Sequence, residues 1–226
     1  MIAENAAQNP GKTADWADSA EQAILDAAIA LAPDLGWSST MLNRAAAQAG
    51  FSRGEAMLVL PNGPRDLAAL LSARHDHRAL TCLADVDPAG LKMRERIRQG
   101  VEARLDAADA NAGAVRRWAG FLALPPNLPL ALRLTWESAD VIWRWAGDTA
   151  TDENHYSKRA ILSGILIATL AIRLASGRDA ASAYLGARID NVMAFEKWKA
   201  GIKPAELARD IATALGRLRY GRTSGV

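Results

Sequence analysis

Residues 118–160, WAGFLALPPNLPLALRLTWESADVIWRWAGDTATDENHYSKRA, carry the pattern that decides the fold. Apolar side chains recur at helical spacing on both sides of Leu124–Pro129, where three prolines remove backbone donors and force a corner between helices over about 114–123 and 130–146. The stretch also holds four of the seven tryptophans. Because tryptophan presents a large, rigid apolar surface, we predict a wall for a hydrophobic ligand, followed by a charged, aromatic patch over 152–159.

The same helical period extends toward the N-terminus, and no segment alternates convincingly as a strand would. Asp18 to Glu21 read as a capping box for a helix that ends near Gly36. Pro64 is well placed as the first residue of a longer helix. Two short helices, over about 40–48 and 52–59, are expected between them. The sequence therefore predicts an all-α fold.

Longer helices are expected in the second half of the chain. Asp87 and Pro88 are expected to begin one of them, and others are predicted over about 153–176, 178–198 and 204–220. The helix over 153–176 contains Ala160–Ile172, thirteen mostly apolar residues that are too few to cross a bilayer. We interpret it as the central core helix or as the lining of a lipid cavity.

The last predicted helix, over about 204–220, is amphipathic and basic. Its apolar residues fall on one face and arginines lie on the flanks. The helix could dock on the protein with solvated arginines, or it could lie in a membrane interface, where apolar burial and anionic headgroups act together. The residues that would contact the membrane are Leu207, Ile211, Leu215, Arg217, Leu218 and Arg219.

Composition and charge indicate a soluble, folded chain. It has 226 residues, of which 50% are hydrophobic and 23% charged, and a net charge of +2. The single cysteine, Cys82, suggests a reducing compartment. The N-terminus lacks the pattern of a signal or transit peptide. We therefore expect a cytoplasmic, bacterial protein.

The search for catalytic and metal motifs is negative. His75 and His77 lie two positions apart, so on a helix they diverge and cannot share a metal ion. No Glu-x-x-His pair, phosphate-binding glycine loop or nucleophile elbow is present. The sequence predicts a protein that is not an enzyme and that has no metal site and no cofactor.

Three short helices followed by a long one resemble the DNA-binding head of TetR-type regulators. The segment that would read DNA, Ser52–Leu58, offers only one arginine, one glutamate and a glycine, and the first helix is acidic. We therefore expect no nucleic-acid binding. A ligand-responsive transcriptional regulator of the TetR type is the alternative function. A second alternative is a helical scaffold whose apolar segments pack only on each other and bind no ligand.

Three motifs resemble the hallmark of one known family. They are Leu124–Pro129, Trp143–Asp148 (WRWAGD) and Thr151–Arg159 (TDENHYSKR). That family is the lipid-binding accessory protein of ubiquinone biosynthesis, the ninth Coq protein, and the similarity extends from about Ile24 to the closing helix. The resemblance implies a TetR-like bundle of about nine to ten helices without DNA binding. It also implies an isoprenoid-lipid pocket, a mobile amphipathic terminal helix that meets the membrane, and a partnership with the di-iron demethoxyubiquinone hydroxylase.

Carried over by position, the resemblance implies a partner-binding surface at Asp152, His155, Tyr156 and Arg159. His155 stands where the motif of the eukaryotic members has a tryptophan. Because histidine buries less apolar area than tryptophan, a weaker contact with the partner or a different partner is expected. The pocket is expected to hold an isoprenoid quinone intermediate or a phospholipid as ligand. Its expected lining is Trp136, Trp143, Ile161, Leu162, Ile165 and Leu166.

The predicted organisation has four parts. They are a disordered segment over 1–17, a helix-turn-helix-like head over 18–63, a lipid-binding body over 64–200, and an amphipathic membrane-interacting helix and tail over 201–226. The expected function is to present the quinone to the hydroxylase without catalysing a reaction. The protein would be peripheral on the inner membrane, with membrane lipids as further partners, and a homodimer is possible.

Overall fold

The computed structural model describes residues 10–149 and 153–201, with side chains placed over 16–149 and 155–191. Within these residues the chain is helical and contains no strand, which confirms the all-α prediction. The helices are α1 Pro10–Leu35, α2 Ser39–Gln48, α3 Arg53–Val59, α4 Pro64–Cys82, α5 Met93–Asp109, α6 Ala112–Leu122, α7 Leu128–Trp145, α8 Glu153–Ser176 and α9 Arg178–Gly201, with 3-10 turns at Pro88–Gly90 and Pro125–Asn127.

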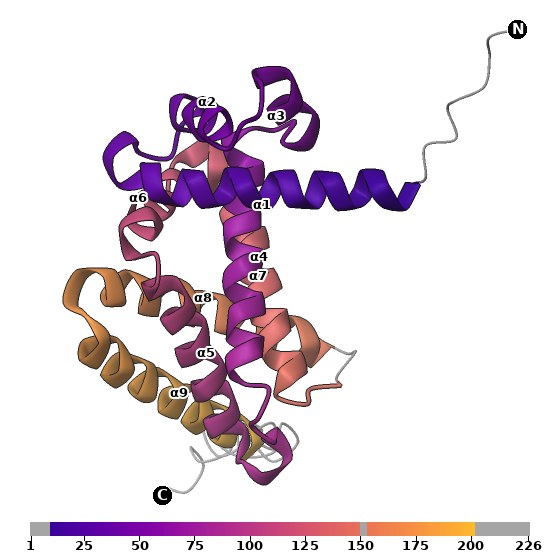
Figure 1. Ribbon diagram of the computed structural model, residues 1–226. Helices are drawn as coiled ribbons and strands as arrows, with labels where there is room; N and C mark the ends of the chain where they lie inside the picture. The colour runs from indigo at the N-terminus through magenta and orange to yellow at the C-terminus, as the bar shows by residue number, and fades with distance from the viewer. Residues whose placement is uncertain (1–9, 150–152, 202–226) are drawn as a thin grey trace, which may run out of the picture.

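Helices α1, α2 and α3 form a head that lies across one end of α4 (Figure 1). Ser38 caps α2 by accepting a hydrogen bond from the Met41 amide, and Ser52 forms a capping box with Glu55 at the start of α3. Trp37 joins the head to α4, because its indole Nε1 donates to the Pro64 carbonyl at 2.9 Å. The two short helices therefore lie where the sequence predicts them.

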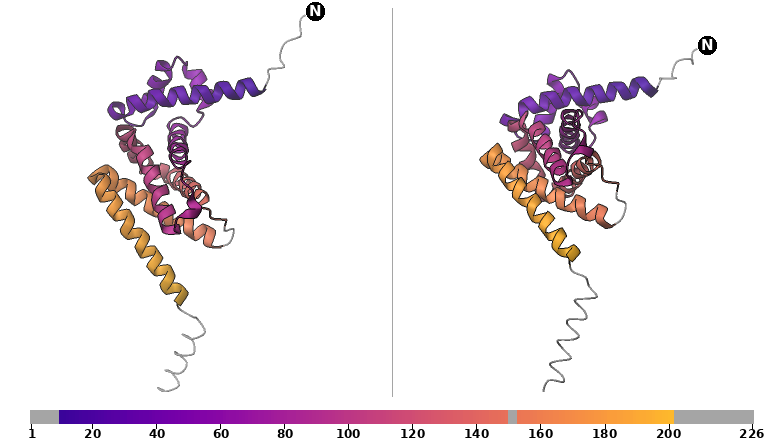
Figure 2. Two further views of the ribbon diagram at one scale, coloured as in Figure 1. Left: turned by 60° about the horizontal axis from the view of Figure 1, so that its bottom comes forward. Right: turned by 90° about the horizontal axis from the view of Figure 1, so that it is seen from below.

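The first helix differs from the prediction at its start. It begins at Pro10 rather than Asp18, so residues 10–17 are helical and not disordered, and Asp18 to Glu21 lie inside the helix where they cannot form a capping box. Its first turns extend away from the other helices (Figures 1 and 2). Gly36 ends the helix with a φ of +72°, a left-handed conformation that glycine adopts without steric cost.

The long helix α4 begins at Pro64, as predicted, and runs through the centre of the protein (Figure 1). His75 is fully buried on it whereas His77 is exposed, so the two imidazoles diverge as their spacing predicts. The prediction that Asp87 and Pro88 begin the next helix was wrong. Asp87 caps a single 3-10 turn by accepting from the Ala89 amide, and α5 begins only at Met93.

Two close contacts position the helices of the body. Gly100 on α5 faces Ile142 on α7, and a Cβ atom on Gly100 would lie 2.6 Å from the Ile142 Cγ2. Glycine therefore lets α5 and α7 approach each other closely. At the predicted proline corner, Asn127 holds α6 against α7, because its side-chain amide donates to the Phe121 carbonyl at 2.9 Å.

Helices α8 and α9 form an antiparallel pair on one side of the body (Figure 2). A 22-residue stretch of α8, His155–Ser176, is long and apolar enough to cross a membrane, with a mean hydropathy of 1.6, although the shorter run Ala160–Ile172 is not. The described α8 packs against α7 and α9 and contributes Leu162 and Leu166 to the core. The predicted helix over 204–220 lies outside the described residues.

Candidate functional site

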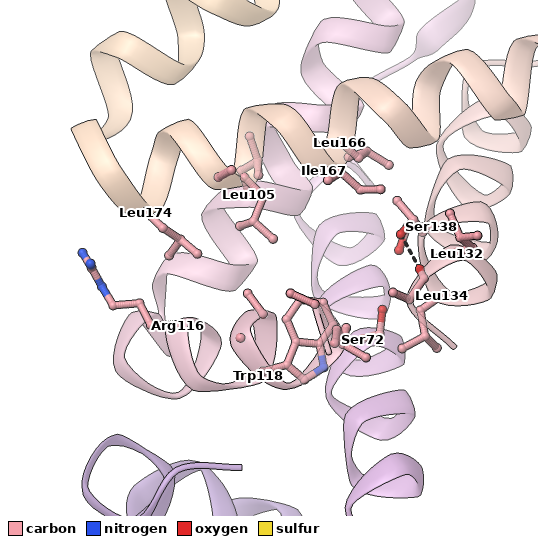
Figure 3. Close-up of a pocket in the computed structure, with 18 of the residues that line it drawn as sticks. Ser72, Leu105, Arg116, Trp118, Leu132, Leu134, Ser138, Leu166, Ile167 and Leu174 are labelled. Carbon is pink, nitrogen blue, oxygen red and sulfur yellow. Dashed lines mark hydrogen bonds between the residues drawn. The ribbon is translucent and has the colours of Figure 1, made fainter. Parts of the chain in front are cut away.

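A cavity of about 690 Å³ lies between five helices of the body (Figure 3). Its walls come from α4, α5, α6, α7 and α8, and most of its lining side chains are aliphatic. They include Leu105, Leu122, Leu134, Leu166, Leu170 and Leu174. This volume is within the range that small-molecule sites occupy, and an apolar lining favours a hydrophobic ligand.

Trp118 of α6 provides one wall of the cavity. Its side chain is only 6% exposed, and its indole Nε1 donates to the Ala68 carbonyl of α4 at 3.0 Å. The hydrogen bond satisfies the polar atom and fixes the ring, so the indole presents only its apolar surface to the cavity. Figure 3 shows the ring beside Ser72 and across the cavity from Leu166 and Ile167.

The cavity reaches the protein surface between α7 and α8. Three of its large apolar lining residues are exposed, namely Leu128 (47%), Leu132 (62%) and Ile167 (47%). Leu128 and Leu132 are four residues apart and therefore lie on the same face of α7. The cavity therefore has an apolar mouth, at which a ligand longer than the cavity could extend along the surface.

A buried polar cluster lies on the inner wall of the cavity. Arg104 of α5 donates from Nε to the Asp76 carboxylate at 2.5 Å, and from Nη2 to the Ser72 hydroxyl at 3.3 Å. Ser138 of α7 donates to Asp76 at 2.8 Å. Ser72, Arg104 and Ser138 all line the cavity and are at most 6% exposed. This cluster therefore places hydrogen-bonding groups at the inner end of an otherwise apolar site.

His75 is buried next to this cluster. Burial, assisted by the positive charges of Arg104, Arg78 and Arg74, lowers the pKa of His75 from 6.5 to about 3. Its Nδ1 has no hydrogen-bond partner within the described residues, and its Nε2 lies 3.5 Å from the Asn111 amide nitrogen. The imidazole is therefore neutral in the folded protein at physiological pH.

The His75→Leu variant is expected to weaken the pH dependence of stability. The unfolded chain binds a proton at this imidazole below about pH 6.5, whereas the folded protein does not until about pH 3, so the wild type loses stability as the pH falls through this window. Between pH 7 and pH 5 the loss amounts to about 2 kcal/mol. Urea unfolding at both pH values measures it. The exposed control His77→Leu should keep the wild-type loss, and an equal loss in His75→Leu would contradict the prediction.

The cavity does not have the lining that the sequence led us to predict. Of the six predicted residues, Leu166 lines it, whereas Leu162 and Ile165 are buried in the core between α5, α7, α8 and α9. Ile161 is 39% exposed, and Trp136 and Trp143 are half-buried outside the cavity. Tryptophan content marks apolar area but not the direction in which it faces, so it did not identify the residues that line the cavity.

Part of the predicted partner surface is exposed. Tyr156 is 64% exposed, with its ring 6.1 Å from that of Trp136 and 5.2 Å from the half-buried ring of His155. Asp152 lies outside the described residues. Within the described residues, Trp136, His155 and Tyr156 form one aromatic patch, which we call the α7/α8 aromatic patch.

Arg159 does not belong to an exposed surface, which corrects the prediction for this residue. Its side chain is 2% exposed and donates to Asp140 at 2.6 Å and to Asp148 at 3.2 Å. Burial by itself would raise the pKa of Asp148, but hydrogen bonds from Lys158 and Arg159 outweigh it, and the pKa of this carboxyl is lowered. Arg159 therefore ties α8 to α7 and to Asp148, which follows the end of α7.

The predicted membrane-contacting residues cannot be placed. Leu207, Ile211, Leu215, Arg217, Leu218 and Arg219 all lie outside the described residues, so their role stays a prediction.

The third helix of the head exposes apolar side chains. Met57 and Leu58 of α3 are 61% and 76% exposed, so the helix that would read DNA in a regulator presents two large apolar side chains.

Sequence reasoning missed most of the cavity lining, including Ser72, Arg104 and Ser138, whereas Trp118 is one of the four tryptophans from which an apolar wall was predicted. One local signal was present, because Leu128 and Leu132 follow the proline corner at a spacing of four on a face that also includes Thr135. The residues from α4 and α5 carry no such signal, since their contribution depends on how distant helices cross.

Comparison with known proteins points to one family. Residues 128–196 match the family model described as COQ9. The chain is 33% identical over 165 residues to the ubiquinone biosynthesis protein COQ9, mitochondrial, of Xenopus tropicalis, with 68% of this chain and 50% of that protein covered. It is 31% identical over 150 residues to the rat protein of the same name, with 63% and 47% covered.

The chain spans about half the length of the curated relatives that it matches. These relatives come from vertebrates, and their names place them in mitochondria. The comparisons therefore do not support the bacterial setting that we predicted from the sequence. The matched region, residues 128–196, includes α7 and α8, which form the mouth of the cavity and the α7/α8 aromatic patch.

Proposed function

The chain belongs to the COQ9 family, and on that premise we propose that it is a non-catalytic accessory protein of ubiquinone biosynthesis that binds an isoprenoid lipid. The cavity of about 690 Å³ between α4, α5, α6, α7 and α8 carries the proposal. Its aliphatic lining favours a ligand that water does not dissolve.

The physical task of such a protein is to hold a polyprenylated quinone intermediate outside the bilayer. Each Å² of apolar area that a ligand removes from water contributes about 25 cal/mol, which is comparable with what a bilayer offers. Transfer of the lipid from the membrane into the cavity therefore requires no large increase in free energy. A long isoprenoid chain would leave the cavity at the mouth, where Leu128, Leu132 and Ile167 offer an apolar path.

The proposal has two further parts. The predicted amphipathic helix over 204–220 would bind the membrane surface and uncover the cavity for loading. The exposed ring of Tyr156, in contact with Trp136 and His155, would dock the hydroxylase that receives the quinone, since exposed aromatic side chains are favoured anchors at interfaces. Arg159 has no part in this docking, because it is buried in its ion pairs.

The alternative function, a TetR-type regulator, fits α3 poorly. A recognition helix contacts base edges with polar side chains and phosphates with basic ones. In this chain α3 presents Met57 and Leu58 beside a single arginine, Arg53. The exposed chemistry of the head therefore favours the accessory protein over the regulator.

Mass spectrometry of a solvent extract from the purified full chain tests the lipid-binding proposal. We expect a prenyl lipid or a phospholipid to be extracted from the wild type. Ala131 is half-buried and lines the cavity, so Ala131→Phe should fill part of it and reduce the bound lipid several-fold.

The matched control is Ala160→Phe, the same substitution at an exposed position of α8 that does not line the cavity. This variant should retain as much lipid as the wild type. A wild-type extract without lipid, or equal lipid in the two variants, would remove the cavity as the binding site.

A further inference from the structure

In the buried polar cluster of Ser72, Asp76, Arg104 and Ser138, some donor hydrogens are bonded within the protein and others are not. The Asp76 carboxylate accepts from two donors, because Oδ1 accepts from Arg104 Nε, and the Ser138 hydroxyl is shared between Oδ1 and Oδ2. Ser138 has therefore used its only hydrogen. Neither the carboxylate nor this hydroxyl has a hydrogen left to offer a ligand.

Two donors at the cavity wall remain uncommitted within the described residues. Ser72 Oγ accepts from Arg104 Nη2 at 3.3 Å, and no hydrogen bond there uses the hydroxyl hydrogen of Ser72. Arg104 Nη1 likewise has no acceptor among the described side chains and backbone groups, although Arg104 and Ser72 both line the cavity. Because Ser72 and Arg104 line the cavity, both donors can bond there to a ligand that supplies an acceptor.

The charge of the cluster restricts that acceptor. Arg104 is paired with Asp76 at 2.5 Å, so the pair is neutral as a unit, and a buried phosphate or carboxylate would bring an uncompensated negative charge into it. The other arginine that lines the cavity, Arg116, is exposed, and Figure 3 shows it on the far side of the cavity from Ser138. An anionic headgroup would therefore stay near Arg116, whereas the inner cluster suits a neutral oxygen such as a carbonyl.

The indole of Trp118 adds a preference for a flat ring. Its Nε1 is engaged by the Ala68 carbonyl, and Figure 3 shows the ring beside Ser72. A planar head could stack on this ring and place a carbonyl oxygen at the Ser72 hydroxyl and at Arg104 Nη1.

We infer that the cavity binds a neutral lipid with a carbonyl-bearing ring head, that this head enters first, and that Ser72 and Arg104 donate to its carbonyl oxygen while the tail leaves between α7 and α8. The inference rests on the proposed lipid binding and adds the orientation of the ligand and the residues that select it. A ligand held in this way keeps its ring away from water until it is released.

Competitive displacement of a solvatochromic dye from the purified full chain tests the inference with two probes, 2-decyl-1,4-benzoquinone and decylbenzene. The probes share a flat six-membered carbon ring and the decyl tail, and they differ in the two carbonyl groups and the aromaticity of the ring. Because a hydrogen bond contributes about 0.5–1.5 kcal/mol, we expect the wild type to prefer the quinone by about ten-fold. Ser72→Ala should reduce this preference several-fold, while the affinity for decylbenzene stays unchanged.

Thr135→Val provides the matched control. Thr135 also lines the cavity, but its hydroxyl already donates to the Ala131 carbonyl at 2.5 Å, so the variant removes a hydroxyl without removing a free donor. Its preference for the quinone should equal that of the wild type. Infrared spectra provide an independent measurement, because the carbonyl stretch of the bound quinone should fall below its frequency in alkane and rise again in Ser72→Ala.

The outcomes separate the two proposals. If both probes bind equally well to the wild type, the polar cluster does not select the ligand, although the cavity still binds lipid. If Ser72→Ala keeps the full preference and the carbonyl frequency of the wild type, the assignment to Ser72 is overturned. If neither probe displaces the dye, both the orientation and the proposed lipid binding fail.

Discussion

The Arg159→Met variant is expected to lose about 3–5 kcal/mol of unfolding free energy, as is found when one partner of a buried ion pair is removed. Arg159 is 2% exposed and donates to Asp140 and Asp148, and the side chain of Asp148 is only 5% exposed. Methionine fills a similar volume but leaves the Asp148 carboxylate buried with Lys158 as its remaining cation. Urea unfolding followed by circular dichroism measures the loss.

The control for this variant is Arg144→Met. Arg144 pairs with the same Asp140 carboxylate at 2.7 Å, but its side chain is 74% exposed, so its ion pair contributes about 1 kcal/mol or less. A similar loss in the two variants would show that burial does not set the energy of these pairs. If Arg159→Met proved as stable as the wild type, the position of Arg159 inside the fold would be wrong.

The Trp118→Ala variant is expected to lose about 3–5 kcal/mol, because it removes a large buried side chain and leaves a void. Trp118 packs in the core that joins the head to the body, as well as lining the cavity. The variant also leaves the Ala68 carbonyl without the indole donor that bonds it. Thermal and urea unfolding of the purified variant measure the loss.

Two further variants separate the causes of this loss. Trp118→Phe keeps most of the apolar volume and removes the donor to Ala68, so it should lose about 1–3 kcal/mol. Trp136→Ala removes a half-buried indole outside the cavity and should cost less than Trp118→Ala. Equal losses at Trp118 and Trp136 would contradict the assignment of Trp118 to the core.

Local sequence signals predicted most helix boundaries. Pro64 begins α4, Gly36 follows the end of α1, and the proline corner separates α6 from α7, because each residue acts on the backbone beside it. The same kind of signal failed at Asp18 and at Asp87. Aspartate also occurs in helix interiors and in single turns, so a cap pattern alone does not decide which helix follows.

The candidate site was less predictable than the helices. Trp136 and Trp143 are apolar and large, yet neither lines the cavity that Trp118 lines. Arg159 belongs to a motif of charged residues, yet it is among the most buried of the side chains that the structure describes. In both cases the residue type was informative, but its surroundings depend on helices far away in the sequence.

Helical periodicity, caps and prolines act through hydrogen bonds within a few residues, so they sufficed to predict an all-α protein with its helices in this order. The position of the cavity, the leucines that line it and the contact of Arg104 with Asp76 at its inner wall depend instead on how the helices pack. The reason is that the walls come from residues as far apart as Ser72 and Ala175, and the crossing of five helices brings them together.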